Sequence, residues 1–197
     1  MEHQNLAPFT GVILAGGQSR RMGQNKAQLE FEGKTLLEHQ VEKLRRVGAA
    51  EILISGEGCQ KLPGTKVVAD ILPNRGPLGG LHACLQVASY SRCLVLSVDA
   101  PLVPVETLRQ ICATHSEGAT VLSHGEYVEP LIGMYDSAVA QSLFALIENG
   151  GAPVRALKNL LKWNTLEYQG DENLLCNCNT RQEFADMKKI ADKTKIR

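Results

Sequence analysis

The chain has few aromatic residues, no excess of either charge and no long apolar run. Phenylalanine, tryptophan and tyrosine make up 5% of its 197 residues, and 21 basic residues balance 21 acidic ones. Without a basic excess, a general affinity for nucleic acid or for a membrane surface is not expected. Without an apolar stretch of roughly 18 residues, no transmembrane helix is expected either. The 44% of hydrophobic residues is typical of a globular protein with a packed core.

The six cysteines form no Cys-x-x-Cys pair, and residues 1–10 lack the charged-then-apolar layout of a signal peptide. Several cysteines lie in apolar runs, as Cys93 does before Leu94-Val95-Leu96. These features predict buried, reduced thiols in a cytoplasmic protein. Cys176-x-Cys178 would suit a metal ion, but no second pair of ligands stands nearby. Reduced thiols are therefore the favoured interpretation.

Short aliphatic runs alternate with helical patterns along the chain. The predicted strands are Thr10–Leu14, Glu51–Ser55, Lys66–Val68, Cys93–Ser97 and Ala119–Ser123. The predicted helices are Thr35–Val47, Leu81–Ser89, Val105–His115, Ser137–Glu148, Pro153–Leu161 and Thr180 to about Ala191. The strands hardly alternate in polarity, as expected when both faces of a parallel sheet are covered. This order predicts a three-layer α/β/α, Rossmann-like domain with a mostly parallel central sheet.

No linker, repeat or low-complexity segment divides the chain, so a single domain over residues 1–197 is predicted, with a core of about 9–191 and a charged, frayed tail at 192–197. In such sheets the ligand lies beyond the carboxyl ends of the strands. Chemistry-bearing residues are therefore expected directly after each strand.

The segment from Leu14 to Lys26 reads Leu-Ala-Gly-Gly-Gln-Ser-Arg-Arg-Met-Gly-Gln-Asn-Lys and follows the first predicted strand. Adjacent glycines at Gly16 and Gly17 let the backbone approach a ligand, and free N–H groups in such a loop form an anion-binding concavity. Arg21 and Lys26 add positive charge suited to phosphate. The spacing is neither that of a Walker loop nor that of Gly-x-Gly-x-x-Gly. The segment predicts a phosphate site; an ordinary turn with solvated basic residues is the alternative.

Two aspartates follow later predicted strands. Asp99 comes after the strand that ends at Ser97, and Mg²⁺ prefers carboxylate oxygens together with substrate phosphates. Asp70 follows the predicted strand Lys66–Val68 and precedes a glycine-rich segment at Gly76–Gly80. A metal ligand is therefore predicted at Asp99, and a ligand-binding residue is considered at Asp70. The alternatives are a turn role for Asp99 and a solvated loop position for Asp70.

The segment 14–26 resembles the signature of GT-A-like nucleotidyltransferases, L-A-G-G-x-S-x-R-M-G-x-x-K, and matches it at every fixed position. Within that superfamily the chain is most similar to the molybdenum cofactor guanylyltransferases, the MobA family. Gly-Pro-Leu-Gly-Gly at 76–80 and Asn-x-Asn-Thr at 177–180 carry the narrower resemblance. The resemblance extends from Thr10 to about Asp186.

The resemblance implies a GT-A-like nucleotidyltransferase fold and the transfer of GMP from GTP-Mg²⁺ to the phosphate of Mo-molybdopterin, with release of pyrophosphate. The product would be the guanine dinucleotide form of the cofactor. The implied partners are GTP, molybdopterin or Mo-molybdopterin, and further the molybdopterin-synthesis proteins and molybdoenzyme acceptors. No nucleic acid or membrane is implied.

The resemblance also implies roles for single residues. Lys26, Arg21 and Asp99 would be catalytic, with Lys26 stabilising charge at the α-phosphate and Asp99 holding Mg²⁺. The implied nucleotide-binding residues are Leu14, Ala15, Gly16, Gly17, Lys26, Ser55, Asp70, Gly79 and Asp99. Asn179 is a second candidate metal ligand, with a helix cap as its alternative. Whether Asp70 contacts the base or the ribose stays open.

The acceptor side is less defined. Glu129 and Pro130 match the family's Gln/Glu-Pro-Leu-x-Gly-Leu-Tyr strand and would line the acceptor pocket. Arg155, Lys158 and Lys162 would either meet an acidic pterin phosphate or form a solvated basic face.

Two other functions stay open. The first is a cytidylyltransferase for molybdopterin, or a transferase for a sugar phosphate or methylerythritol phosphate; Asp70 and the segment 76–80 favour guanine instead. The second is a nucleotide-binding adaptor without activity, against which Lys26 and Asp99 argue.

Overall fold

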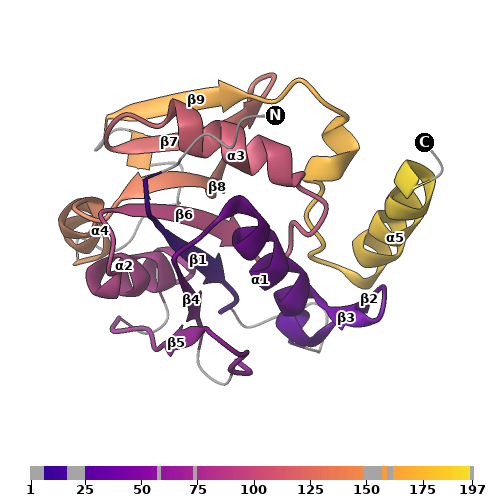
Figure 1. Cartoon of the computed structure of the whole chain (residues 1–197), viewed down its shortest axis with the longest axis horizontal. Helices are drawn as coiled ribbons and strands as arrows, with labels where there is room; N and C mark the ends of the chain where they lie inside the picture. Colours follow the sequence, from indigo (N-terminus) through magenta and orange to yellow (C-terminus); the bar gives the residue numbers. More distant parts are fainter. Residues whose placement is uncertain are drawn as a thin grey trace.

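The computed structural model describes residues 7–16, 25–56, 59–72, 75–148, 157–158 and 162–195. Its main element is a seven-stranded sheet in the order β5-β4-β1-β6-β8-β7-β9 (Figure 1). The strands are β1 (Thr10–Leu14), β4 (Glu51–Ser55), β5 (Lys66–Val68), β6 (Arg92–Ser97), β7 (Ala119–His124), β8 (Tyr127–Asp136) and β9 (Trp163–Glu167). β8 runs antiparallel to both of its neighbours, and the other pairs are parallel. The predicted mostly parallel sheet is confirmed.

Helices cover both faces of the sheet (Figure 1). On one face lie α1 (Leu36–Val47) and α3 (Val105–Thr114), and on the other α2 (Pro77–Val87) and α4 (Val139–Glu148). The C-terminal helix α5 (Arg181–Lys195) packs against the core of α1 and α3. Along β1, Ile13 enters that core while Val12 and Leu14 enter the core of α2 and α4. Both faces of the central strands are buried, so apolar residues occupy successive positions there, from Val12 to Leu14 in β1 and from Cys93 to Leu96 in β6.

The register of the central strands sets up the functional edge. Leu14, the last residue of β1, is level with Ser55 in β4 and with Ser97 in β6. Val98 N donates to Leu14 O at 3.1 Å, and Ala15 N donates to Ser55 O at 3.0 Å. The chain therefore leaves three adjacent strands at the same edge of the sheet.

The predicted capping box of α1 is confirmed. Thr35 Oγ1 accepts from Glu38 N at 3.2 Å, and Glu38 Oε2 accepts from Thr35 N at 2.7 Å. The helix ends at Gly48, whose φ of 102° is a left-handed conformation that glycine adopts without strain. Before α1, a hairpin of β2 (Glu30–Phe31) and β3 (Lys34–Thr35) was not predicted.

Two predicted helix boundaries are wrong. α2 begins at Pro77 rather than at Leu81, because proline fits the first helical turn and Gly76 supplies the positive φ of 60° before it. The segment 76–80 is thus a helix start and not an extended loop. α5 continues to Lys195, so residues 192–195 of the predicted frayed tail are helical. The predicted helix Pro153–Leu161 lies mostly outside the described residues, and no described helix is long and apolar enough to cross a membrane.

Candidate active site

Three side chains from distant parts of the sequence meet beyond the end of β6. Lys26 opens the short helical turn η1 (Lys26–Gln28), and its Nζ donates to Asp99 Oδ2 at 3.0 Å and to Asn179 Oδ1 at 2.6 Å. The side chains of Lys26 and Asp99 are 16% and 18% exposed. An ion pair at this depth is less screened by solvent than a surface pair. The predicted residues Lys26, Asp99 and Asn179 thus form one cluster.

The carboxylate of Asp99 is held from several sides. Ser97 Oγ donates to Asp99 Oδ1, and the backbone oxygen of Asp99 accepts from Cys178 N at 2.8 Å and from Cys178 Sγ at 3.1 Å. Burial raises the pKa of the Cys178 thiol to about 12, so the thiol stays protonated and can donate a hydrogen bond. Cys178 is a packing and hydrogen-bonding residue, as the favoured interpretation of the cysteines predicted.

Asn179 lies next to the start of α5, where a second capping box forms. Glu183 Oε2 accepts from Thr180 N at 2.8 Å and from Asn179 N at 2.7 Å, and Thr180 Oγ1 accepts from Glu183 N at 3.2 Å. The Asn179 side chain takes no part in this box. Its amide oxygen is directed to Lys26, which favours the site role over the cap role.

A second group of predicted residues lies beyond β4. Ser55 Oγ donates to Asp70 Oδ1 at 3.3 Å, and both groups face the first turn of α2. A Cβ added at Gly80 would lie 2.0 Å from Ser55 Oγ and 3.3 Å from Asp70 Oδ1, and one at Gly79 would lie 2.9 Å from Leu72 O. The two glycines let the helix start approach Ser55 and Asp70, which explains why small residues stand there.

The strand ends β1 and β4 also approach each other closely. A Cβ added at Gly16 would lie 3.2 Å from Gly56 Cα, and one at Gly56, whose φ is 138°, would lie 2.9 Å from Gly16 Cα. The predicted need for glycine at Gly16 therefore has a backbone contact as one physical basis. Leu14, Ala15 and Gly16 lie between the Asp99 cluster and the Ser55–Asp70 pair. Gly17 and Arg21 lie outside the described residues.

Because the resemblance implies that Ser55 and Asp70 bind the nucleotide, replacing Gly80 with alanine is expected to raise the KM for the nucleotide by about tenfold, while kcat changes less. The added methyl displaces the Ser55 hydroxyl and with it the Asp70 carboxylate; lost pairing of one buried polar group costs about 1–3 kcal/mol. Steady-state kinetics measures both constants.

The matched test of Gly80→Ala is the pair with Ser55→Ala. Removing the hydroxyl relieves the 2.0 Å contact, so the double variant should bind nucleotide better than Gly80→Ala alone. A double variant in which the two KM increases simply multiply would contradict this explanation.

One basic residue that was considered for the acceptor's phosphate lies elsewhere. Lys162 precedes β9, which starts level with β7, and β7 runs parallel to β6. Lys162 therefore lies at the sheet edge opposite Asp99, where it pairs with Glu117 at 2.5 Å. This position and its exposed partner favour the solvated face, the second of the two alternatives given for Lys162. Lys158 is exposed, and Arg155 lies outside the described residues.

The acceptor-side candidates Glu129 and Pro130 are at the correct edge. β8 continues beyond Ile132, which pairs with Leu96 near the end of β6, so its first residues extend past that end. Glu129 Oε1 lies 3.5 Å from His124 Nε2. The Pro130 backbone oxygen accepts from the Tyr135 hydroxyl at 2.5 Å.

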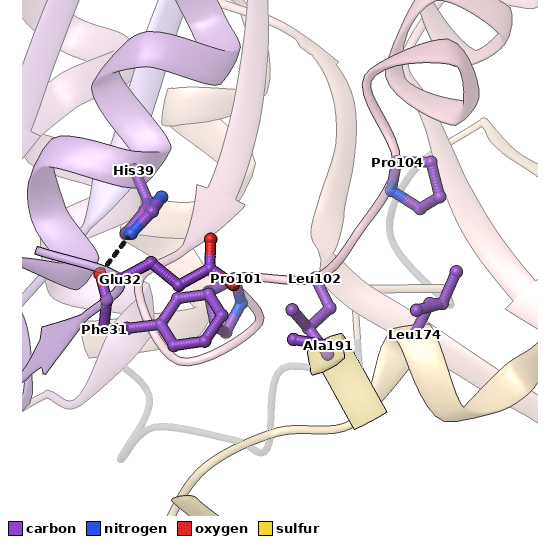
Figure 2. Close-up of a pocket in the computed structure, with 8 residues that line it drawn as sticks. All are labelled: Phe31, Glu32, His39, Pro101, Leu102, Pro104, Leu174 and Ala191. Carbon is purple, nitrogen blue, oxygen red and sulfur yellow. Dashed lines mark hydrogen bonds between the residues drawn. The ribbon is translucent and has the colours of Figure 1, made fainter. Parts of the chain in front are cut away.

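A cavity of about 360 Å³ lies beside the chain segment that follows β6, at Pro101, Leu102 and Pro104 (Figure 2). The residues that line it come from the β2–β3 hairpin, α1, the chain after β6, and the C-terminal region: Phe31, Glu32, His39, Pro101, Leu102, Pro104, Leu174 and Ala191. The imidazole of His39, which lines the cavity, already has a hydrogen-bond partner, because its Nε2 contacts Phe31 O at 2.7 Å. No lysine or arginine is among these lining residues.

The donor set of the cluster suits a hard divalent cation. A carboxylate and an amide oxygen, on Asp99 and Asn179, already converge on one positive charge, the Lys26 ammonium. No group of three or more acidic, histidine or cysteine side chains that could hold a metal occurs among the described residues. Such a sparse oxygen set agrees with Mg²⁺, which uses one or two carboxylates, several waters and the phosphates of its substrate.

A lysine, a half-buried carboxylate and a second carboxylate beside a glycine-rich helix start lie at the carboxyl ends of the strands of a mostly parallel sheet, an arrangement that suits a nucleotidyltransferase. Residues 11–167 match the family described as the MobA-like NTP transferase domain. The chain belongs to this family.

A named relative agrees with this assignment, and two solved structures share the fold. A protein of Pelotomaculum thermopropionicum named "Probable molybdenum cofactor guanylyltransferase" is 34% identical over 95% of this chain and 91% of its own. The structure of molybdopterin-guanine dinucleotide biosynthesis protein A from Archaeoglobus fulgidus has a TM-score of 0.75 and 22% identity, covering 93% of this chain and 99% of that one. A Mycobacterium tuberculosis protein in complex with manganese has a TM-score of 0.66 and 20% identity, with coverages of 93% and 99%.

Proposed function

We propose that the protein transfers GMP from GTP to the phosphate of Mo-molybdopterin and releases pyrophosphate. One observation carries the proposal: two groups of side chains lie at the carboxyl ends of the central strands. One group is Lys26 with Asp99 and Asn179, and the other is Ser55 with Asp70. The name of the Pelotomaculum relative supports the choice of substrates.

The Lys26 ammonium would bind the triphosphate and stabilise the charge that develops around the α-phosphate. Asp99, together with Asn179, would hold Mg²⁺, which when bound neutralises charge on the phosphates of the nucleotide. The manganese complex of the Mycobacterium tuberculosis relative supports the use of a divalent metal. The acceptor's phosphate is already an anionic nucleophile, so positioning and electrostatics suffice and no strong protein base is needed.

Asp70 would bind the guanosine moiety, because its carboxylate lies at the start of α2 with Ser55 as its hydrogen-bond donor. Leu14, Ala15, Gly16 and Gly79 would contribute the surrounding backbone. Gly17 and Arg21 remain candidates by their place in the motif.

Glu129 and Pro130 would line the acceptor side.

We also propose that residues 1–197 act as one transferase domain. A cytoplasmic location is supported by the cysteines, which are free thiols at all six positions.

The proposal is tested by pyrophosphate release with GTP and CTP in parallel, with molybdopterin as the acceptor and Mg²⁺ present. We expect a kcat/KM for GTP at least about a hundredfold above that for CTP, since a site built to pair polar groups of one base leaves them unpaired with another. A preference for CTP would identify a cytidylyltransferase. Nucleotide binding without pyrophosphate release from either would identify an adaptor.

A matched variant locates the base preference. Asp70→Asn keeps the size of the side chain but replaces one acceptor oxygen by a donor. It should reduce the GTP preference and leave the slow reaction with CTP unchanged.

A further inference from the structure

A buried amide spans the turn that carries Asp99. Gln40 lies in the middle of α1 and is 1% exposed. Its Nε2 donates to Ser97 O at 2.7 Å and to Ala100 O at 3.1 Å. These two carbonyls lie before and after Asp99 in the sequence, so a single side chain bridges the turn that carries Asp99.

The turn has little other support from its own backbone. Between Ser97 and Ala100, the Ala100 N–H reaches Ser97 O at 3.5 Å, which is the limit of a hydrogen bond. Two neighbouring carbonyls are bound from outside the turn: Asp99 O by Cys178 and Pro101 O by Lys43 Nζ. Burial, and secondarily Arg46, lowers the pKa of Lys43 to about 7, and a neutral amine still donates to Pro101 O.

Only the nitrogen of the Gln40 amide has hydrogen-bond partners. Its Oε1 is buried without a hydrogen-bond partner in the described structure. A buried, unpaired oxygen destabilises the fold, and an apolar side chain at this helix position would avoid that cost. Its neighbours on the same helix face are apolar: Leu36, Leu37, Val41 and Leu44. The two N–H donors are therefore the feature that this position supplies.

We propose that Gln40 is a positioning residue for the transfer reaction, acting through Asp99 on the binding of the divalent metal. This inference rests on the proposed function. A primary amide has two N–H groups on one nitrogen and can bind both carbonyls at once, which neither methionine nor glutamate can do. By fixing the turn, Gln40 directs the Asp99 carboxylate toward Lys26 and Asn179. Second-layer partners of this kind change metal affinity by about 10- to 100-fold when removed.

The test measures the dissociation constant of GTP by calorimetry, with MnCl₂ and with EDTA, in the full-length protein. The ratio of the two constants is the gain in GTP affinity from the metal, and it needs no turnover. Gln40→Met has a similar length and no donor. We expect this gain to fall about tenfold in Gln40→Met, while GTP binding in EDTA stays within about twofold of wild type.

The matched control is Val41→Ala, on the same helix and also buried, at 1% exposed. It destabilises the fold by cavity formation but removes no hydrogen bond to the Asp99 turn, so it should keep the gain in GTP affinity from the metal. Gln40→Asn, which keeps the amide but shortens it by one methylene, should behave like Gln40→Met. This second variant serves if Gln40→Met does not fold.

A double variant separates positioning from general damage. In an Asp99→Asn background the gain should be lost already, and adding Gln40→Met should not change it further. A folded Gln40→Met with a wild-type gain, or an effect that persists without Asp99, would overturn the inference. The proposed function is judged on the wild-type protein alone. If wild type releases pyrophosphate, the proposed function stands whatever the Gln40→Met result is. If wild type neither binds GTP nor releases pyrophosphate, the proposed function itself fails.

Discussion

Replacing Asp99 with asparagine should lower the rate of pyrophosphate release by about a thousandfold. The variant keeps the shape of the side chain and an oxygen toward the site, but it loses the negative charge that would hold the metal. The Lys26 ammonium, now 3.0 Å from a neutral amide, also loses its counter-ion. The rate is measured at saturating GTP over a series of Mg²⁺ concentrations. Excess Mg²⁺ should restore part of the activity.

The control for this substitution is a carboxylate at the opposite edge of the sheet. Asp136 ends β8, where it accepts from Gly118 N at 2.6 Å and contacts His115 Nε2 at 3.1 Å. Asp136→Asn should lower the melting temperature and leave kcat within about threefold of wild type, because it lies far from the nucleotide. An Asp99→Asn protein that kept a tenth or more of the wild-type rate would remove Asp99 from the reaction.

Much of the sheet could be predicted because most of its parallel strands are local, aliphatic signals. β1, β4 and β5 have the predicted bounds, and α1 has the predicted cap, since Thr35 and Glu38 interact within one helical turn. The place of Asp99 followed from the same logic. A residue directly after a parallel strand must lie at its carboxyl end.

Other features depend on contacts that local patterns do not contain. The edge strand β9 carries mostly exposed, polar residues and has no aliphatic run to predict it, and the two-residue strands β2 and β3 are too short to give a signal. The role of Cys178 depends on a carbonyl 79 residues away along the chain.

Gln40 carries one sequence signal of its buried role. It is a polar residue at a position where the helical spacing of Leu36, Leu37 and Leu44 requires an apolar one. Such an exception indicates a buried partner, but its partners at Ser97 and Ala100 become apparent only when α1 is packed on the sheet.

Replacing Lys26 with methionine should lower kcat/KM for GTP by about a hundredfold or more, since a group that stabilises developing charge is removed. The geometry also predicts an effect of the opposite sign on the metal. The ammonium lies 3.0 Å from Asp99 Oδ2 and 2.6 Å from Asn179 Oδ1, so it competes with a second cation for the same oxygens. In Lys26→Met the Mn²⁺ concentration that gives half-maximal GTP binding should fall several-fold, although catalysis is impaired.

Lys26→Arg separates charge from shape, because it keeps the cation and changes its geometry. It should retain the wild-type metal requirement and part of the activity. A rise in the metal requirement of Lys26→Met would mean that Lys26 organises the oxygens for the metal rather than competing with it. Such a result would move Lys26 from binding the triphosphate to supporting Asp99, and the transfer would then need another cation at the α-phosphate, for which Arg21 is the candidate in the same motif.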